Sequence, residues 1–329
     1  MGEQMLRRKL GQSERLISAI GLGCWQFSRN HGLVGSYWGD METGLIDSII
    51  RTSIKGGVNW FDTAEMYGNG TSEKILSASL QRLEIKDQEM MIATKWNPVL
   101  RFAHSIERTF PERSANLAPF PVALLQVHNP FSLSSIEYQM RHLSNLVNDR
   151  KIELVGVSNF SLERMKRAHE YLKANGLFLA SNQMRYSLLD RSIEFNGVLD
   201  YARQQQITII AYSPLAQGVL TGRYHEKNGL IRTKPGFRKY LPAFQERSLR
   251  RSLPLINILR EIAREHAVTP AQVALRWVIQ YAGDSIMAIP GASSELQAQQ
   301  NAAVMDFNLT PAEVQLLDKI SKEINPFVG

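Results

Sequence analysis

Short apolar runs recur along the chain, and each one ends at a polar residue or a turn. Runs of this length, bounded by turn residues, are typical of buried β-strands. The pattern predicts eight strands, at residues 17–23, 58–64, 90–95, 122–128, 152–158, 179–184, 207–213 and 285–290.

The segments between these runs carry apolar residues at three- and four-residue spacing, which is typical of amphipathic helices. Ser161 is a favoured N-cap, and Pro270, after Thr269, occupies the favoured first helical position. Glycines follow the apolar spacing where a helix should end. These signals bound three helices most clearly, over 44–57, 161–176 and 269–283.

Strands that alternate with helices occur in doubly wound open sheets and in (β/α)8 barrels. The 329 residues suit a barrel, which needs about 250 residues plus insertions. The longest insertions, residues 24–41 and 216–252, each follow a strand, so in a barrel they lie on the active-site face. A Rossmann sheet would need G-x-G-x-x-G after the first strand, but Gln26 replaces the third glycine. We therefore expect one α/β domain over residues 1–329, a (β/α)8 TIM barrel.

Composition narrows the class of protein further. Hydrophobic residues make up 44% of the chain and charged residues 21%, as in ordinary globular proteins. A lone cysteine, Cys24, excludes an internal disulfide and favours a reducing compartment. No apolar run has the length of a signal peptide or of a membrane span, which needs roughly 20 residues. We expect a cytoplasmic protein with no membrane partner.

The net charge of +7 is concentrated in one segment. Between Thr221 and Arg251, nine basic residues stand against two acidic ones, so their difference equals the net charge of the whole chain. A local basic segment indicates a local anionic ligand, although a solvated loop would have the same composition.

Four candidate catalytic residues stand at or just after successive predicted strands. Asp62 and Tyr67 follow the second strand, Lys95 ends the third and His128 ends the fourth. Each has an ordinary structural explanation alone, but in a barrel these strand ends meet at one rim. A lysine ammonium lowers the pKa of a tyrosine, ordinarily about 10, and a carboxylate holds that ammonium in place. With a histidine to bind the substrate oxygen, the group can polarise a carbonyl and protonate the alkoxide left after hydride attack.

Seven motifs, in the same order, resemble those of the aldo-keto reductase family over residues 21–301. They are FDTAEMYG, ATKW, LLQVHNP, GVSNFS, NQMRYSLLDR, AYSPLAQGVLTGRY and IPGASSELQAQQN. The resemblance implies a (β/α)8 barrel with an N-terminal β-hairpin cap and long loops on its C-terminal face. It also implies an extended nicotinamide cofactor and a catalytic tetrad of Asp62, Tyr67, Lys95 and His128. Tyr67 would be the proton donor, and Asp62 would hold Lys95 against it.

The resemblance also assigns cofactor positions. Ser158, Asn159 and Gln183 match the residues that hold the carboxamide, and Tyr212 matches the aromatic residue that stacks on the nicotinamide. The remaining cofactor positions lie along the pyrophosphate, around the adenosine and at the ends of the first two strands: Ser213, Pro214, Leu215, Gln217, Gly218, Arg223, Gly291, Ser293, Gln297, Gln300, Asn301, Cys24, Trp25 and Asp62. We expect Cys24 to serve packing rather than chemistry.

The cofactor type depends on how the 2′-phosphate is bound. Many family members carry a basic residue at the position of Ser293 or Gln297, and this chain does not. Members with serine and glutamine there bind NADP through basic residues of the long loop, where this chain has Arg223, Arg232 and Arg238. We therefore expect NADP(H) rather than NAD(H).

The substrate pocket is expected to include Trp25, Trp38, Tyr67, Trp96, His128 and Asn129. The aromatic residues of segment 24–41 form either a substrate wall or a loop held by its own side chains. Asn129 replaces a tryptophan that is common in the family, which would open the pocket. Before the fourth strand, Pro111, Pro119 and Pro121 are expected to break a helix and its exit.

The sequence thus favours an NADP-dependent reductase of a small aldehyde or ketone, with no metal and no nucleic-acid partner. Two alternatives stay open. One is a nicotinamide-binding regulatory subunit of low turnover, like the channel-associated members of the family, which often lack the histidine. The other is a phosphosugar barrel enzyme that binds substrate phosphate with the basic loop. The sequence predicts neither the physiological substrate nor the reaction direction nor the oligomeric state.

Overall fold

A computed structural model describes residues 6–28, 40–86, 89–226 and 240–324. It contains a parallel barrel whose strands follow chain order, β3-β4-β5-β6-β7-β8-β9-β10. A parallel bridge between Ile20 and Ala288 joins the two edge strands and closes the barrel. All eight strands lie within or beside the predicted apolar runs: β3 (Leu22–Gly23), β4 (Trp60–Asp62), β5 (Met91–Trp96), β6 (Val122–Val127), β7 (Leu154–Ser158), β8 (Leu179–Arg185), β9 (Thr208–Tyr212) and β10 (Ile286–Ala288).

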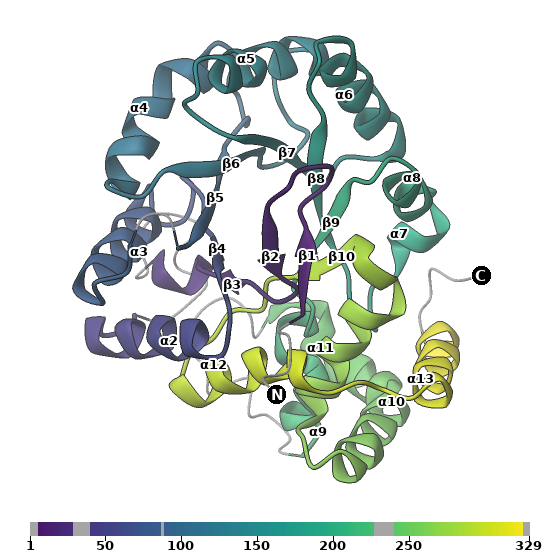
Figure 1. Ribbon diagram of the computed structural model, residues 1–329. Coiled ribbons are helices and arrows are strands. Elements are labelled where there is room, and N and C mark those ends of the chain that lie inside the picture. Colours follow the sequence, from purple (N-terminus) through teal and green to yellow (C-terminus); the bar gives the residue numbers. More distant parts are fainter. Residues whose placement is uncertain (1–5, 29–39, 87–88, 227–239, 325–329) are drawn as a thin grey trace.

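Helices surround this barrel, as Figure 1 shows in a view close to the barrel axis. The three helices bounded most clearly from the sequence are confirmed as α2, α6 and α11, and Thr269 forms a capping box with Gln272. None of the helices in the described residues is long and apolar enough to cross a membrane. The helices are α2 (Thr43–Lys55), α3 (Thr71–Arg82), α4 (Ser105–Leu117), α5 (Ile136–Asn148), α6 (Leu162–Ala174), α7 (Ser192–Phe195), α8 (Val198–Gln204), α9 (Arg223–Glu226), α10 (Glu246–Glu265), α11 (Pro270–Tyr281), α12 (Glu295–Ala302) and α13 (Pro311–Ile324).

An antiparallel hairpin of β1 (Arg7–Lys9) and β2 (Leu16–Ser18) lies across one opening of the barrel (Figure 1). Its side chains Leu10 and Ile17 are buried in a cluster with the inward-facing residues of the barrel. The amide of Gly11 donates to Oγ1 of Thr208, the first residue of β9, over 2.8 Å. The hairpin therefore closes the N-terminal end of the barrel, as expected, and leaves the C-terminal end for a site.

The expected break at Pro111 is not present, because α4 continues through this residue to Leu117. Pro111 is exposed, while Ile106, Phe110 and Leu117 on either side of it are buried. Proline removes one helical hydrogen bond. Apolar burial on both sides of Pro111 outweighs that loss, so the helix ends only before Pro119.

Candidate active site

The four candidate catalytic residues converge at the C-terminal ends of neighbouring strands. Asp62 is the last residue of β4 and Lys95 is the penultimate residue of β5. His128 directly follows β6, and its amide donates to the carbonyl of Trp96 over 2.9 Å. Tyr67 lies in the turn between β4 and α3. The parallel register of β4, β5 and β6 thus places residues far apart in sequence at one rim.

The Lys95 ammonium is the centre of this group. Its side chain is fully buried and forms an ion pair with Oδ1 of Asp62. It also donates to the carbonyl of Thr63 over 2.9 Å and to the Tyr67 hydroxyl over 3.4 Å. The Tyr67 ring lies edge-on to the His128 ring, with 5.6 Å between centroids, and stacks with Trp25 at 6.0 Å. The tetrad predicted from the sequence is therefore assembled in space.

Burial controls the protonation of these groups. It raises the pKa of Tyr67, and although Lys95 acts to lower that pKa, burial and Asp62 outweigh it. Lys95 thus acts on the Tyr67 pKa in the expected direction, but burial and Asp62 make the net change upward. Burial also acts to lower the pKa of Lys95, but Asp62 and Tyr67 reverse the effect and raise it. Burial and the Lys95 charge lower the pKa of His128 to about 3. At neutral pH the site holds a protonated tyrosine and a neutral histidine.

A buried charged network, which the sequence analysis missed, fixes the turn that carries Tyr67. Glu65 in this turn accepts hydrogen bonds from Arg101, Arg113 and the amide of Asn97. Arg113 Nε also lies 2.9 Å from Oε2 of Glu73, a fully buried residue of α3. The turn is therefore joined to β5, α3 and α4. Two acidic residues near the tyrosine, Glu65 in the turn and Glu73 in the first turn of α3, were the available signal.

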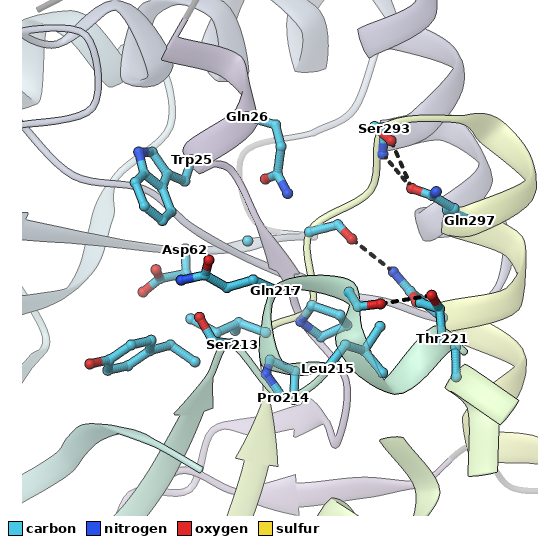
Figure 2. Close-up of a pocket in the computed structure, with 18 of the residues that line it drawn as sticks. Trp25, Gln26, Asp62, Ser213, Pro214, Leu215, Gln217, Thr221, Ser293 and Gln297 are labelled. Carbon is cyan, nitrogen blue, oxygen red and sulfur yellow. Dashed lines mark hydrogen bonds between the residues drawn. The ribbon is translucent and has the colours of Figure 1, made fainter. Parts of the chain in front are cut away.

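A cavity of about 710 Å³ extends from the tetrad to the start of α12. Figure 2 shows Asp62 and Trp25 toward one end and Ser293 and Gln297 toward the other. All of the expected cofactor residues that the structure describes line it: Cys24, Trp25, Asp62, Ser158, Asn159, Gln183, Tyr212, Ser213, Pro214, Leu215, Gln217, Gly218, Arg223, Gly291, Ser293, Gln297, Gln300 and Asn301. Sequence reasoning missed further lining residues: Gly23, Gln26, Thr221, Tyr224, Thr269, Pro270, Ala271, Gln272, Ile289 and Pro290.

A chain of hydrogen bonds connects the predicted nicotinamide end to the tetrad. The Tyr212 hydroxyl donates to Asn159 over 2.9 Å, and Asn159 donates to the Ser158 hydroxyl over 3.0 Å. Ser158 donates to the carbonyl of Gln183, whose side-chain amide donates to Asp62 over 2.8 Å. Asn159 has a left-handed backbone, with φ of 59°. Non-glycine residues in this conformation are often found at functional sites.

The opposite end of the cavity carries neutral hydrogen-bonding groups. The amide and hydroxyl of Ser293 both donate to Oε1 of Gln297, drawn as dashed lines in Figure 2. Asn301 donates to the carbonyl of Gly291 over 3.3 Å. Arg223 is exposed, and it is the basic residue among the described residues that line the cavity. This is the end at which α12 begins, after its N-cap Ser294.

Gln26 joins two walls of the cavity. It belongs to the 3-10 helix η1 (Trp25–Ser28), which follows β3. A Cβ atom on Gly291 would lie 1.8 Å from Nε2 of Gln26, so a larger residue in the loop after β10 would displace the end of the Gln26 side chain.

Some expected site residues lie elsewhere. Trp96 is only 2% exposed, donates to Ser105 and does not line the cavity, so it belongs to the barrel wall rather than to the substrate pocket. Asn129 is not among the residues that line this cavity either, and its side chain accepts from the amide of Phe131 over 3.0 Å. Trp38, Arg232 and Arg238 lie outside the described residues.

Cys24 is fully buried, and its thiol contacts the carbonyl of Leu22. Burial raises the pKa of Cys24 well above its ordinary value, so the reactive thiolate is strongly disfavoured. In the described residues no group of three or more His, Cys, Asp or Glu side chains is arranged to hold a metal ion.

Comparisons with known proteins agree with this geometry. A model of the aldo/keto reductase family matches residues 19–322. An uncharacterised oxidoreductase of Mycobacterium tuberculosis is 36% identical over 311 residues, which cover 94% of this chain and 91% of that protein. A glycerol dehydrogenase structure from Gluconobacter oxydans is 26% identical with a TM-score of 0.83, covering 98% of this chain and 96% of that one. An aldo/keto reductase from Klebsiella pneumoniae, solved with NADP and acetate, is 25% identical with a TM-score of 0.72, covering 97% and 96%. The chain belongs to the aldo/keto reductase family.

Proposed function

We propose that the protein is an NADP(H)-dependent oxidoreductase that reduces an aldehyde or ketone to an alcohol, with Tyr67 as the proton donor. The observation that carries this proposal is the Tyr67 hydroxyl, 3.4 Å from the buried Lys95 ammonium, at one end of an elongated cavity. A tyrosine in contact with a cation and facing a cavity is suited to proton transfer.

Each residue of the tetrad has a distinct task in this proposal. The raised pKa of Tyr67 keeps its proton in place until the substrate oxygen becomes basic. Lys95 then stabilises the phenolate that remains, and Asp62 holds Lys95 in position. His128 is neutral, because its pKa is about 3, so it donates a hydrogen bond from its ring without competing as an acid.

The cavity residues fit a nicotinamide dinucleotide in an extended form. Ser158, Asn159, Gln183 and Tyr212 all line the cavity. In the proposal the first three bind the carboxamide, and the aromatic ring of Tyr212 stacks on the nicotinamide. The cofactor supplies the hydride when bound. Backbone amides at the start of α12 suit a phosphate group. The relative from Klebsiella pneumoniae, solved with NADP, supports this choice of cofactor.

NADP is favoured over NAD by the groups around the adenosine end. Arg223 lies exposed on the wall of the cavity, where its guanidinium can reach a phosphate group. Gln297 uses Oε1 to accept from Ser293, which leaves its amide N–H groups to donate. No acidic side chain lines this end of the cavity among the described residues, and acids are the groups that would repel a 2′-phosphate.

The Tyr67→Phe variant tests the proposal. Removing the hydroxyl leaves the ring and its stacking on Trp25, so we expect carbonyl reduction to fall by at least about a thousandfold, in the range that acid–base catalysis supplies. Tryptophan fluorescence titrations should still give tight NADPH binding and weaker NADH binding. Substantial turnover by the variant would refute the role of Tyr67, and equal binding of NADH would refute the preference for NADP.

A further inference from the structure

The carboxylate of Asp62 accepts hydrogen bonds from side chains outside the tetrad as well as from Lys95. Lys95 occupies Oδ1. Two neutral amides donate to Oδ2, from Gln183 over 2.8 Å and from Gln126 over 3.1 Å. Gln183 lines the cavity, where it has a proposed cofactor role, but Gln126 does not line it. Gln126 is a fully buried residue of β6, so its described contact with the site is through Asp62.

The barrel makes space for this amide. Gln126 is paired across the sheet with Gly156 of β7, and Gly156 is paired with Ser181 of β8. A Cβ atom on Gly156 would lie 2.8 Å from Cγ of Gln126 and 2.5 Å from Oγ of Ser181. Contacts this short do not occur for real side chains, so glycine at this position is what permits Gln126 to extend toward Asp62.

The side chain of Gln126 also lowers the stability of the core. Its Oε1 atom is buried and has no hydrogen-bond partner among the described residues. An unpaired buried polar atom destabilises a protein, whereas an apolar side chain of similar shape would avoid that loss. Stability alone therefore does not explain why residue 126 carries an amide. The hydrogen bond from this amide to Asp62 offers the explanation.

We propose that Gln126 is a positioning residue for the reaction proposed above, and that by donating to Asp62 it governs how readily Tyr67 exchanges its proton. A hydrogen-bond donor stabilises the negative charge of a carboxylate and weakens its action on neighbouring groups. Without Gln126, Asp62 would offset more of the Lys95 charge, and less would be left to stabilise a phenolate. The pKa of Tyr67, which Lys95 lowers and Asp62 raises, would then rise further.

The other titratable groups around Asp62 do not mask the expected change in the pKa of Tyr67. The titratable side chains that face it are Cys24 after β3, Tyr67 in the turn after β4, Lys95 on β5 and His128 after β6. Cys24 and His128 are neutral near neutral pH, because burial raises the pKa of the first and lowers that of the second to about 3.

The remaining strands contribute hydroxyl and amide groups. Ser158 on β7 and Gln183 on β8 do not titrate, and the Tyr212 hydroxyl on β9 is bonded to Asn159. The buried residues of β10 are apolar. A change in Asp62 is therefore transmitted chiefly to Lys95 and Tyr67.

The test is the pH profile of alcohol oxidation with NADP⁺, whose kcat/KM rises with pH as Tyr67 ionises. We expect Gln126→Met, which keeps the shape but removes the amide, to move the midpoint of this rise upward by at least about half a pH unit. At pH values below the midpoint, the rate would then be about threefold lower than that of the wild type. Gly156→Ala, which displaces Gln126 without altering it, should move the midpoint in the same direction.

The matched control is Gln139→Met. Gln139 is a buried glutamine of α5 whose amide donates to the carbonyls of Ser134 and Ser135, away from Asp62. This variant should lose stability without moving the midpoint. An unchanged or lowered midpoint in both Gln126→Met and Gly156→Ala, in an active enzyme, overturns the role of Gln126 alone. A wild type that transfers no hydride to or from NADP overturns the proposed function and this inference with it.

Discussion

At the scale of single residues, the site depends on burial as much as on charge. Lys95 and Asp62 are almost completely buried, and their ion pair is joined to Tyr67 by a hydrogen bond. The same environment keeps His128 neutral over the whole physiological pH range. In the proposed reaction, a neutral histidine would bind the carbonyl oxygen without supplying the proton itself, which would leave proton donation to Tyr67.

The depressed pKa of His128 predicts how folding depends on pH. The folded pKa of about 3 lies below the unfolded value of 6.5, so the unfolded chain binds the proton first as pH falls. The stability contribution is complete above the unfolded value and is lost as pH falls toward the folded one. We expect His128→Asn to gain about 2 kcal/mol relative to wild type between pH 7 and about pH 4.5, measured by urea unfolding. The same difference between the two proteins at both pH values would contradict the low pKa.

At the scale of elements, the turn between β4 and α3 is held by charges that come from elsewhere in the barrel. Arg113, on α4, contacts both Glu65 in the turn and Glu73 on α3. Burial raises the pKa of Glu73, and Arg113 acts in the opposite direction. Precise placement of Tyr67 therefore depends on a helix that contributes no residue to the tetrad.

Replacing Arg113 with Met should destabilise the protein by about 3–5 kcal/mol, because it leaves buried carboxylates without their cation. Urea unfolding at neutral pH measures this loss. The double variant Arg113→Met with Glu73→Gln should recover part of it, since one uncompensated charge is removed. Arg250→Met, which breaks an exposed ion pair with Glu246, is the control and should change stability by less than about 1 kcal/mol. A cost at Arg113 no larger than that of the control would show that the network is not structurally important.

The same scale shows what the sequence could and could not predict. The strand ends that carry Asp62, Lys95 and His128 were predictable, because short apolar runs mark strands and parallel strand ends meet at one rim. The network around Glu65 was not, because it depends on which helix packs beside the turn. The helix break predicted at Pro111 was wrong for a similar reason, since buried neighbours on both sides keep its helix intact. Gln126 did leave a signal, as a polar residue within an apolar strand.

At the scale of the whole molecule, the two ends of the barrel differ, since one is closed by apolar packing and the other holds the candidate site. The N-terminal hairpin closes one end of the barrel with Leu10 and Ile17, while the other end holds the tetrad and the elongated cavity (Figures 1 and 2). Family motifs predicted most of the cavity lining. They did not indicate Gln26 or the start of α11. These residues line the cavity but lie outside the family motifs, so only the folded arrangement shows them there.

The most direct measurement of the central claim is a single-turnover assay of the wild-type protein with NADPH and a panel of aldehydes and ketones. The account predicts that enzyme in excess consumes bound NADPH and forms one alcohol for each NADPH lost. Failure to bind NADPH would contradict the assignment of the cavity. Tight NADPH binding with no alcohol formed from any carbonyl would contradict the catalytic role of the tetrad, and would favour a regulatory protein that binds the cofactor without turnover.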